Sequence, residues 1–223
     1  MITVIVRTLN EAKNIERFCR GYDFANRILI ADGGSTDATL ELANQFGNVE
    51  IREFEERVEM PYGFMNPESR HFNFVLNWAK EYEPEWVIYD DCDSIPNKFL
   101  YRDAIELLAM AQHPVLHVRR LYLWLKDQYF PKMGRGASLW AWQPDKINIY
   151  GEDKKDYGVQ IRGIPDETGR DELDFPYCLL HDFYPDDETV QYKMERYAAW
   201  GMPQEHPLEW RYAPPEPLPE WAL

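Results

Sequence analysis

The 223-residue sequence has few cysteines, no long hydrophobic run and a shortage of positive charge. Its three cysteines, Cys19, Cys92 and Cys178, are widely spaced and form neither a disulfide framework nor a CxxC metal motif, so we expect reduced thiols in a cytoplasmic protein. No apolar stretch approaches the ~20 residues of a membrane-spanning helix. The N-terminus is a short apolar stretch that contains Arg7, which favours a buried strand over a signal peptide.

The charge balance restricts the partners of the chain. Lys and Arg number 24 and Asp and Glu number 39, which gives a formal net charge of −15 at pH 7. This balance argues against nucleic acid or an anionic membrane surface as the main partner. An anionic substrate would have to be held locally, by a metal ion or by a few placed cations. Hydrophobic residues make up 45% and aromatic residues 15%, which excludes a disordered chain and allows a substantial core.

Strand and helix patterns alternate over the first half of the chain. Short apolar runs predict buried strands at residues 2–6, 27–31, 49–54 and 86–89 and from residue 115. Between them, apolar side chains at helical spacing predict helices that begin near Asn10, Ser35 or Thr36, Asn66 and Pro96. This order predicts an α/β fold with a doubly wound, mostly parallel sheet and helices on both faces.

The pattern changes after Arg120. The following segment is aromatic and lacks a helical period, and residues 151–176 are acidic and rich in turn-forming residues. A last helix is predicted from about residue 186 to 200, and the tail from residue 203 holds six of the 16 prolines. We expect one domain at residues 1–202 and an extended tail at residues 203–223.

Three polar clusters follow predicted strands, at residues 8–11, 32–37 and 90–94. Ligands of doubly wound sheets bind beyond the carboxyl ends of the strands, so this placement indicates a ligand site. Asp91 and Asp93 point to the same side of an extended chain and repel each other unless a cation or a hydrogen-bond donor lies between them. They fit a divalent metal ion, but they could also cap the helix that Pro96 opens.

The two earlier clusters also admit two interpretations. They could be helix caps and tight turns, or they could form a nucleoside pocket in which carboxylates accept hydrogen bonds from ribose and base. The sequence contains no GxGxxG and no GxxxxGK[ST], so neither a dinucleotide fingerprint nor a P-loop is present.

Four segments, at residues 2–11, 28–40, 70–79 and 86–96, carry distinctive residues in a fixed order. These residues are Asn10-Glu11, Asp32 with Gly34-Ser35-Thr36-Asp37, Arg70 with Asn73, and Asp91-Cys92-Asp93. The combination resembles four successive motifs of the family 2 glycosyltransferases of the GT-A fold.

Beyond Pro96 the resemblance is patchier and points to the branch that includes lipopolysaccharide-core glucosyltransferases. It runs through residues 119–150, Leu179-Leu180-His181 and residues 191–197. The chain departs from that branch at Ser94, where the branch has Glu, and at Pro165-Asp166-Glu167, where it has His-Glu.

The resemblance implies an inverting, metal-assisted transfer of a sugar from a nucleotide-diphosphate donor, a UDP-sugar first, to a carbohydrate or other hydroxyl acceptor, as in polysaccharide biosynthesis. Residues 1–118 would be the nucleotide-binding half and residues 119–202 the acceptor-side half. The nucleotide would be bound by Thr8, Leu9, Asn10, Glu11, Asp32, Arg70 and Asp91. Mn²⁺ or Mg²⁺ would be bound by Asp91, Asp93 and His181, the last as a neutral imidazole, although a lone histidine is more often structural.

A carboxylate must deprotonate the acceptor hydroxyl as general base. By the resemblance we expect Asp166 or Glu167, and Glu152 and Asp153 are alternatives in the same acidic stretch. Arg119 or Arg120 could add a cation to the donor phosphates. The side chains that could stack on sugar rings, or else pack in the core, are Trp140, Trp142 and Tyr150.

Two other classes of protein fit parts of the pattern. A nucleotidyltransferase also combines a nucleotide with metal-binding carboxylates, but its glycine-rich N-terminal loop with a basic residue is absent after Val6. A catalytically silent nucleotide-sugar or carbohydrate-binding protein would have a broken Asp-x-Asp or no base, whereas Asp91 and Asp93 are intact. The sequence predicts no transmembrane segment, and a peripheral contact with a membrane-bound acceptor is compatible with it.

Overall fold

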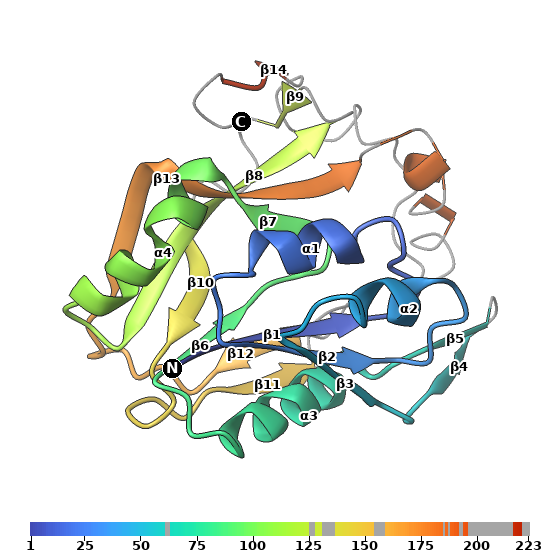
Figure 1. Ribbon diagram of the computed structural model, residues 1–223, viewed down its shortest axis with the longest axis horizontal. Coiled ribbons are helices and arrows are strands. Elements are labelled where there is room, and N and C mark those ends of the chain that lie inside the picture. The colour runs from blue at the N-terminus through green and yellow to red at the C-terminus, as the bar shows by residue number, and fades with distance from the viewer. Residues whose placement is uncertain are drawn as a thin grey trace.

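The computed structural model describes residues 1–60, 63–124, 128–130, 137–153, 159–184, 186, 188–191, 194–195 and 216–219. Its centre is one mixed sheet, which Figure 1 shows with helices above and below it. In spatial order its strands are β14 (Glu216–Pro217), β9 (Gln128–Tyr129), β8 (Val115–Trp124), β10 (Ala137–Trp142), β6 (Trp86–Tyr89), β1 (Ile2–Thr8), β2 (Arg27–Asp32) and β3 (Val49–Glu53). Two further strands, β13 (Asp171–Tyr184) and β7 (Ser94–Pro96), pair with each other, and β13 also pairs with β8.

One half of the sheet is parallel. Strands β6, β1, β2 and β3 all pair in parallel, with Ile2 opposite Trp86 and Thr3 opposite Arg27. The apolar runs of β1 and β2 are buried on both faces, as continuous β-branched runs in a parallel sheet should be. The predicted α/β fold with a mostly parallel sheet is therefore confirmed.

Helices cover both faces of this sheet. Helices α1 (Ile15–Gly21), α2 (Thr39–Ala43) and α4 (Lys98–Met110) pack on one face, where Phe18 and Leu100 share a core cluster with Val4. Helix α3 (Glu68–Lys80) packs on the other face, where Phe72 shares a cluster with Ile5. The hairpin β11 (Tyr150–Asp153) and β12 (Val159–Arg162) lies beside α3, as Figure 1 shows.

Several helices begin later than the sequence suggests. Asn10 has a φ of 58°, outside the helical region, and α1 starts at Ile15. Helix α2 starts at Thr39, whose backbone N–H donates to Asp37. Pro96 belongs to the short strand β7, and the side chain of Asn97 caps α4 by accepting from Leu100 N. In each case the residue expected to begin the helix lies in a polar loop or in a strand instead.

The second half of the chain contains more strand than expected. Residues 151–176, predicted to be an acidic and turn-rich segment, contain most of the β11–β12 hairpin and the start of β13. A small hairpin also forms from β4 (Val58–Met60) and β5 (Gly63–Met65). The helix predicted at residues 186–200 and the tail at 203–223 lie largely outside the described residues; within the tail, Glu216–Pro217 pairs with β9.

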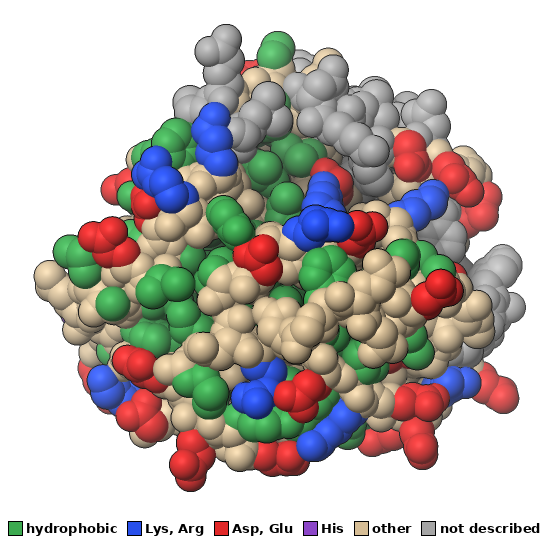
Figure 2. Space-filling view, viewed as in Figure 1, with side chains coloured by type: hydrophobic (Ala, Val, Ile, Leu, Met, Phe, Trp, Pro, Cys, Tyr) green, Lys and Arg blue, Asp and Glu red, His purple; other side chains and the backbone are tan. Residues whose placement is uncertain are grey.

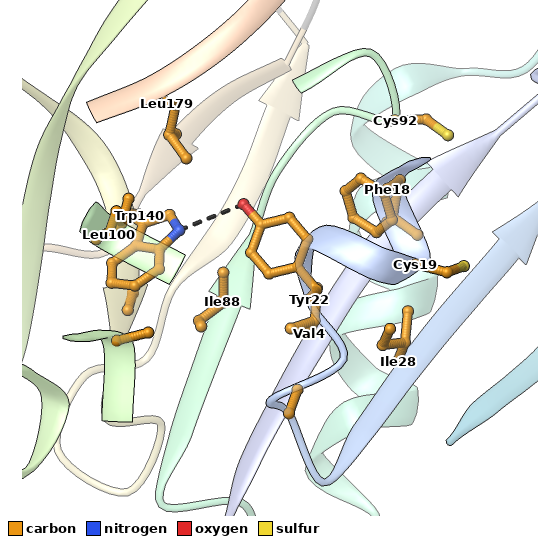
Figure 3. Close-up of a cluster of buried hydrophobic side chains, with 14 of the residues drawn as sticks. Val4, Phe18, Cys19, Tyr22, Ile28, Ile88, Cys92, Leu100, Trp140 and Leu179 are labelled. Atoms are coloured by element: carbon orange, nitrogen blue, oxygen red, sulfur yellow. Dashed lines mark hydrogen bonds between the residues drawn. The ribbon is translucent and has the colours of Figure 1, made fainter. Parts of the chain in front are cut away.

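Two of the three aromatic side chains considered for sugar stacking belong to the core. Trp140 and Trp142 are both 0% exposed, and Figure 3 shows Trp140 among buried side chains with its indole N–H donating to the Tyr22 hydroxyl. The stacking interpretation is therefore wrong for both tryptophans. Tyr150, on β11, is exposed. Within the described part of the chain, no helix has the length and apolar character needed to cross a membrane.

Candidate active site

The carboxyl ends of β1, β2 and β6 meet at one edge of the sheet, called the carboxyl edge below. Thr8 at the end of β1 lies opposite Asp32 at the end of β2, and Ile5 of β1 lies opposite Tyr89 at the end of β6. The three polar clusters predicted to follow strands therefore come together at this edge, where ligands of such sheets bind.

Asp32 organises the loop that follows β2. Its side chain is buried, and its two carboxylate oxygens accept from Gly34 N, Ser35 N, Ser35 Oγ and Thr8 Oγ1 at 2.6–2.9 Å. Gly34 has a φ of +94°, which a side chain would make costly. The hydrogen bonds of Asp32 therefore shape the loop and tie it to β1.

The loop that follows β1 interlocks with the one that follows β2. Asn10 N donates to Ser35 Oγ, and Thr36 N donates back to Asn10 Oδ1, both at 2.8 Å. Glu11 N donates to Thr39 Oγ1 at 2.7 Å. Leu9 between them is half-buried. The predicted nucleotide-binding residues of these two loops thus belong to one hydrogen-bonded double loop, with Asn10 on its exposed side.

Asp91 is held between two arginine side chains, one of which acts through a tyrosine. Its Oδ2 accepts from Arg120 Nη1 at 3.1 Å, and its Oδ1 accepts from the Tyr89 hydroxyl at 3.1 Å. The same hydroxyl accepts from Arg7 Nη2 at 2.9 Å. Burial alone would raise the pKa of Asp91, but Arg120, His181 and Arg7 outweigh burial and lower it. Asp91 is therefore a fixed, ionised carboxylate.

Arg7 and Tyr89 were not singled out from the sequence, and Asp90 was noted only as part of the polar cluster at residues 90–94. Asp90 is fully buried and accepts from Arg120 Nη2 at 2.7 Å; burial raises its pKa to about 6 in spite of that neighbour. The available signals were an arginine inside an apolar strand and a doubled aspartate at the end of another. Both are costly in a core unless they find partners.

Asp93 and His181 lie next to each other although they are far apart in the sequence. Strand β13 pairs with β7 so that His181 lies opposite Ser94, and Nδ1 of the imidazole is 3.3 Å from Asp93 Oδ1. Arg17 of α1 reinforces this junction, because it pairs with the buried Asp182 and also donates to the Asp93 carbonyl. The predicted partners Asp93 and His181 are thus brought together.

These side chains fit a divalent metal ion as a pair of ligands. A carboxylate oxygen and an imidazole nitrogen are both common ligands of Mn²⁺-like ions. Asp91 faces Arg120 and Tyr89 instead, and among the described residues no group of three or more His, Cys, Asp or Glu side chains is arranged to hold a metal. Phosphate oxygens and water could supply further ligands.

Arg70 lies on the rim of the carboxyl edge, in the first turns of α3. Its side chain is mostly exposed and pairs with Glu56 at 2.6 Å. Asn73, the other residue of that motif, instead bonds in both directions with the backbone of Gly151 and so anchors β11 to α3. Arg70 is therefore the more accessible cation of the motif.

The structure separates the four candidate general bases. Asp166 and Glu167 are exposed in a turn before β13, and that strand begins opposite Leu116, at the edge of the sheet remote from His181. The structure does not bring them to the carboxyl edge. Asp153 does reach it, because its Oδ1 accepts from Ser69 N at 3.3 Å in the first turn of α3.

Glu152, the neighbour of Asp153, forms an exposed pair with Arg162 on the adjacent strand β12. Arg119, the other cation considered for the phosphates, lies over the Phe175 ring and 3.9 Å from the exposed Asp174. Neither contact involves a residue of the carboxyl edge.

The buried arginines differ from the charges on the outer surface. On the face shown in Figure 2, basic side chains lie singly or in small groups beside acidic ones. Exposed pairs such as Arg20 with Glu16 and Arg102 with Asp103 are of the kind that contributes little to stability. Water screens the ionic contacts of Arg7 and Arg120, at 15% and 13% side-chain exposure, less than these exposed pairs.

No protein-family model matches this chain, and no curated protein matches it. Solved structures do share its fold. The crystal structure of S. aureus TarS is similar with a TM-score of 0.56 and 19% identity, over 87% of this chain and 39% of that one. TarS 1–349 in complex with UDP-GlcNAc gives a TM-score of 0.53 and 18% identity, over 81% and 58%.

Glucosyl-3-phosphoglycerate synthase from Mycobacterium tuberculosis, in complex with Mn²⁺, UDP and glucosyl-3-phosphoglycerate, gives a TM-score of 0.51 and 16% identity, over 91% of this chain and 81% of that one. The chain spans less than two thirds of the length of the TarS structures. At these identities the likeness establishes the fold, which is the GT-A type predicted from the sequence.

Proposed function

We propose that this protein transfers a sugar from a nucleotide-diphosphate donor to an acceptor hydroxyl with the help of a divalent metal ion. A UDP-sugar is the first candidate for the donor. One observation carries the proposal: β6 and β13 bring Asp91, Asp93 and His181 to the carboxyl edge, beside the interlocked loops after β1 and β2. Solved structures with this fold add support, since they contain UDP-GlcNAc in one case and UDP with Mn²⁺ in another.

The donor nucleotide would lie against the double loop. Asn10 is exposed there, while Asp32 is already occupied by donors of the chain itself, so we assign Asp32 the role of shaping the pocket. Arg70 lies at the same edge with an exposed partner, and could turn from Glu56 to the diphosphate at little cost. Asp91, ionised and held on both sides, is suited to accept from a ribose hydroxyl.

Asp93 and His181 would hold the metal ion, Mn²⁺ or Mg²⁺. When bound, the ion would neutralise charge on the diphosphate leaving group. Such a local cation matters in a chain of net charge −15, because the long-range field opposes an anionic donor.

Asp153 is the carboxylate that we propose as general base. It is linked to Asp91 by a series of hydrogen bonds that runs along the start of α3: Ser69 N donates to Asp153, Arg7 donates to the Glu68 carbonyl and to the Tyr89 hydroxyl, and that hydroxyl donates to Asp91. A base at this position lies at the same edge as the proposed donor site, where it could act on an acceptor hydroxyl. Among the described residues, no such series of hydrogen bonds connects Asp166 or Glu167 to Asp91.

The test compares Asp153→Asn with its neighbour Glu152→Gln. Turnover of a UDP-sugar should fall by roughly 10²–10⁴-fold in Asp153→Asn, with UDP affinity little changed, because general bases contribute about that much. Glu152→Gln is the matched control, since its carboxylate pairs with Arg162 on the hairpin surface. Asp166→Asn and Glu167→Gln should also turn over normally.

Two results would contradict this proposal. Loss of turnover in the 166 or 167 variants, with Asp153→Asn active, would move the base to that turn. Nucleotide binding without turnover on any acceptor would favour a binding protein instead of an enzyme.

The assignment to family 2, and to its lipopolysaccharide-core branch, is a prediction from the motifs, which a panel of sugar and lipid-linked acceptors would test.

A further inference from the structure

Asp90 is a carboxylate sealed inside the protein at the carboxyl end of β6. Its side chain is 0% exposed and accepts three hydrogen bonds, from the Tyr22 hydroxyl at 2.6 Å, Arg120 Nη2 at 2.7 Å and Asp91 N at 2.9 Å. A buried carboxylate is tolerated only when it is paired and hydrogen-bonded. Asp90 meets both conditions without reaching solvent or the mouth of the site.

The core fixes Asp90 through Tyr22. The tyrosine follows α1 and is itself 0% exposed, and its hydroxyl accepts from Trp140 Nε1 at 3.4 Å, as the dashed line in Figure 3 marks. Both rings belong to the buried cluster that contains Val4, Phe18 and Leu100. Asp90 therefore has a position set by packed aromatic side chains and not by a flexible loop.

Arg120 connects this buried carboxylate to the one in the site. One arm of its guanidinium binds Asp90, and the other arm, Nη1, binds Asp91 Oδ2 at 3.1 Å. The planar fork of arginine suits two carboxylates at once, which a lysine ammonium could not bind with the same geometry. With both arms used, Arg120 is committed to the protein and is not turned toward a donor.

We infer that Arg120 is a positioning residue: Asp90 and Tyr22 hold it in place, and it holds Asp91 in the orientation in which the site receives the nucleotide. This inference rests on the proposed function and deepens it. It replaces the expectation that Arg120 binds the donor phosphates directly. Its effect on the donor should then depend entirely on Asp91.

Calorimetric titration with UDP and Mn²⁺ tests this through a double-mutant cycle of Arg120→Lys and Asp91→Asn. We expect Arg120→Lys to weaken UDP binding roughly tenfold in the parent, as for a lost hydrogen bond to a charged group. In the Asp91→Asn background the same change should have no further effect. If the two substitutions instead weaken UDP binding by factors that multiply, Arg120 contacts the phosphates independently of Asp91, and the inference is overturned.

A purely structural role makes a different prediction, namely a lower unfolding temperature with unchanged UDP affinity, and that result would also overturn the inference. Because Arg120→Lys could perturb folding, a second variant pairs Asp90→Leu with Arg120→Met. Replacing a buried ion pair with apolar side chains often preserves stability. This variant should remain folded and still lose affinity, while retained affinity would count against the inference.

Failure of the proposed function gives a distinct pattern. If the parent protein binds no UDP with Mn²⁺, the proposed function falls. If the parent binds UDP and the effects of Arg120→Lys and Asp91→Asn on affinity multiply, the proposed function stands and the positioning role alone is refuted.

Discussion

Replacing Asp32 with alanine should destabilise the protein as well as weaken nucleotide binding. The carboxylate is 2% exposed and accepts four hydrogen bonds, from Thr8, Gly34 and twice from Ser35. Each such bond contributes about 1 kcal/mol net, and the half-exposed loop donors can partly turn to water. We therefore expect a loss of about 3 kcal/mol in the free energy of unfolding.

This loss can be read as a shift of the unfolding temperature. A chain of 223 residues has an unfolding entropy of about 0.5 kcal/mol/K, so about 3 kcal/mol lowers the transition by roughly 6 °C. Differential scanning calorimetry measures it. Thr8→Val is the matched control, because it removes one of the four bonds and leaves the carboxylate in place; we expect roughly 2 °C.

The outcome separates two roles of Asp32. If Asp32→Ala lowers the unfolding temperature by no more than the roughly 2 °C expected for the Thr8→Val control, the carboxylate does not organise the loops and our interpretation is refuted. UDP affinity is measured well below both transitions, so that any loss there reflects the shape of the pocket and not unfolding.

Three further predictions concern other parts of the molecule. Asp93→Ala should abolish the metal dependence of UDP binding, measured by calorimetry with Mn²⁺ and with EDTA; equal parent affinity in both conditions would contradict the metal site. Arg17→Met should lower the free energy of unfolding by about 2 kcal/mol, since it leaves the buried Asp182 without its cation, whereas the exposed Arg20→Met should change it by less than about 0.5 kcal/mol. Burial, with nearby Arg7, lowers the pKa of His71 to about 4, so the folded state excludes a proton that the unfolded state takes up near pH 6.5. The contribution of His71 to stability, present above pH 6.5, should therefore fall by about 3 kcal/mol toward pH 4, and the difference in free energy of unfolding between the parent and His71→Gln, measured in urea at each pH, should change by about that amount.

The sequence determined the parallel half of the fold and the loops at its carboxyl edge. Strands β1, β2 and β6 are continuous apolar runs, and such runs have few alternatives to a buried position in a parallel sheet. The polar clusters after them are local in sequence, so their placement at one edge follows from the strand order. Asp91 and Asp93 could be recognised in this way because both the pair and its strand lie within a few residues.

Only the tertiary structure decided which distant side chains meet. His181 reaches Asp93 because β13 pairs with β7 in one register, and a slip of one residue would turn the imidazole to the opposite face. Hydrogen bonds between β11 and α3 place Asp153 at the carboxyl edge, whereas Asp166 precedes the other end of β13. Composition and spacing cannot set a register between strands that are far apart in the chain, because every residue of a short strand offers the same backbone donors and acceptors.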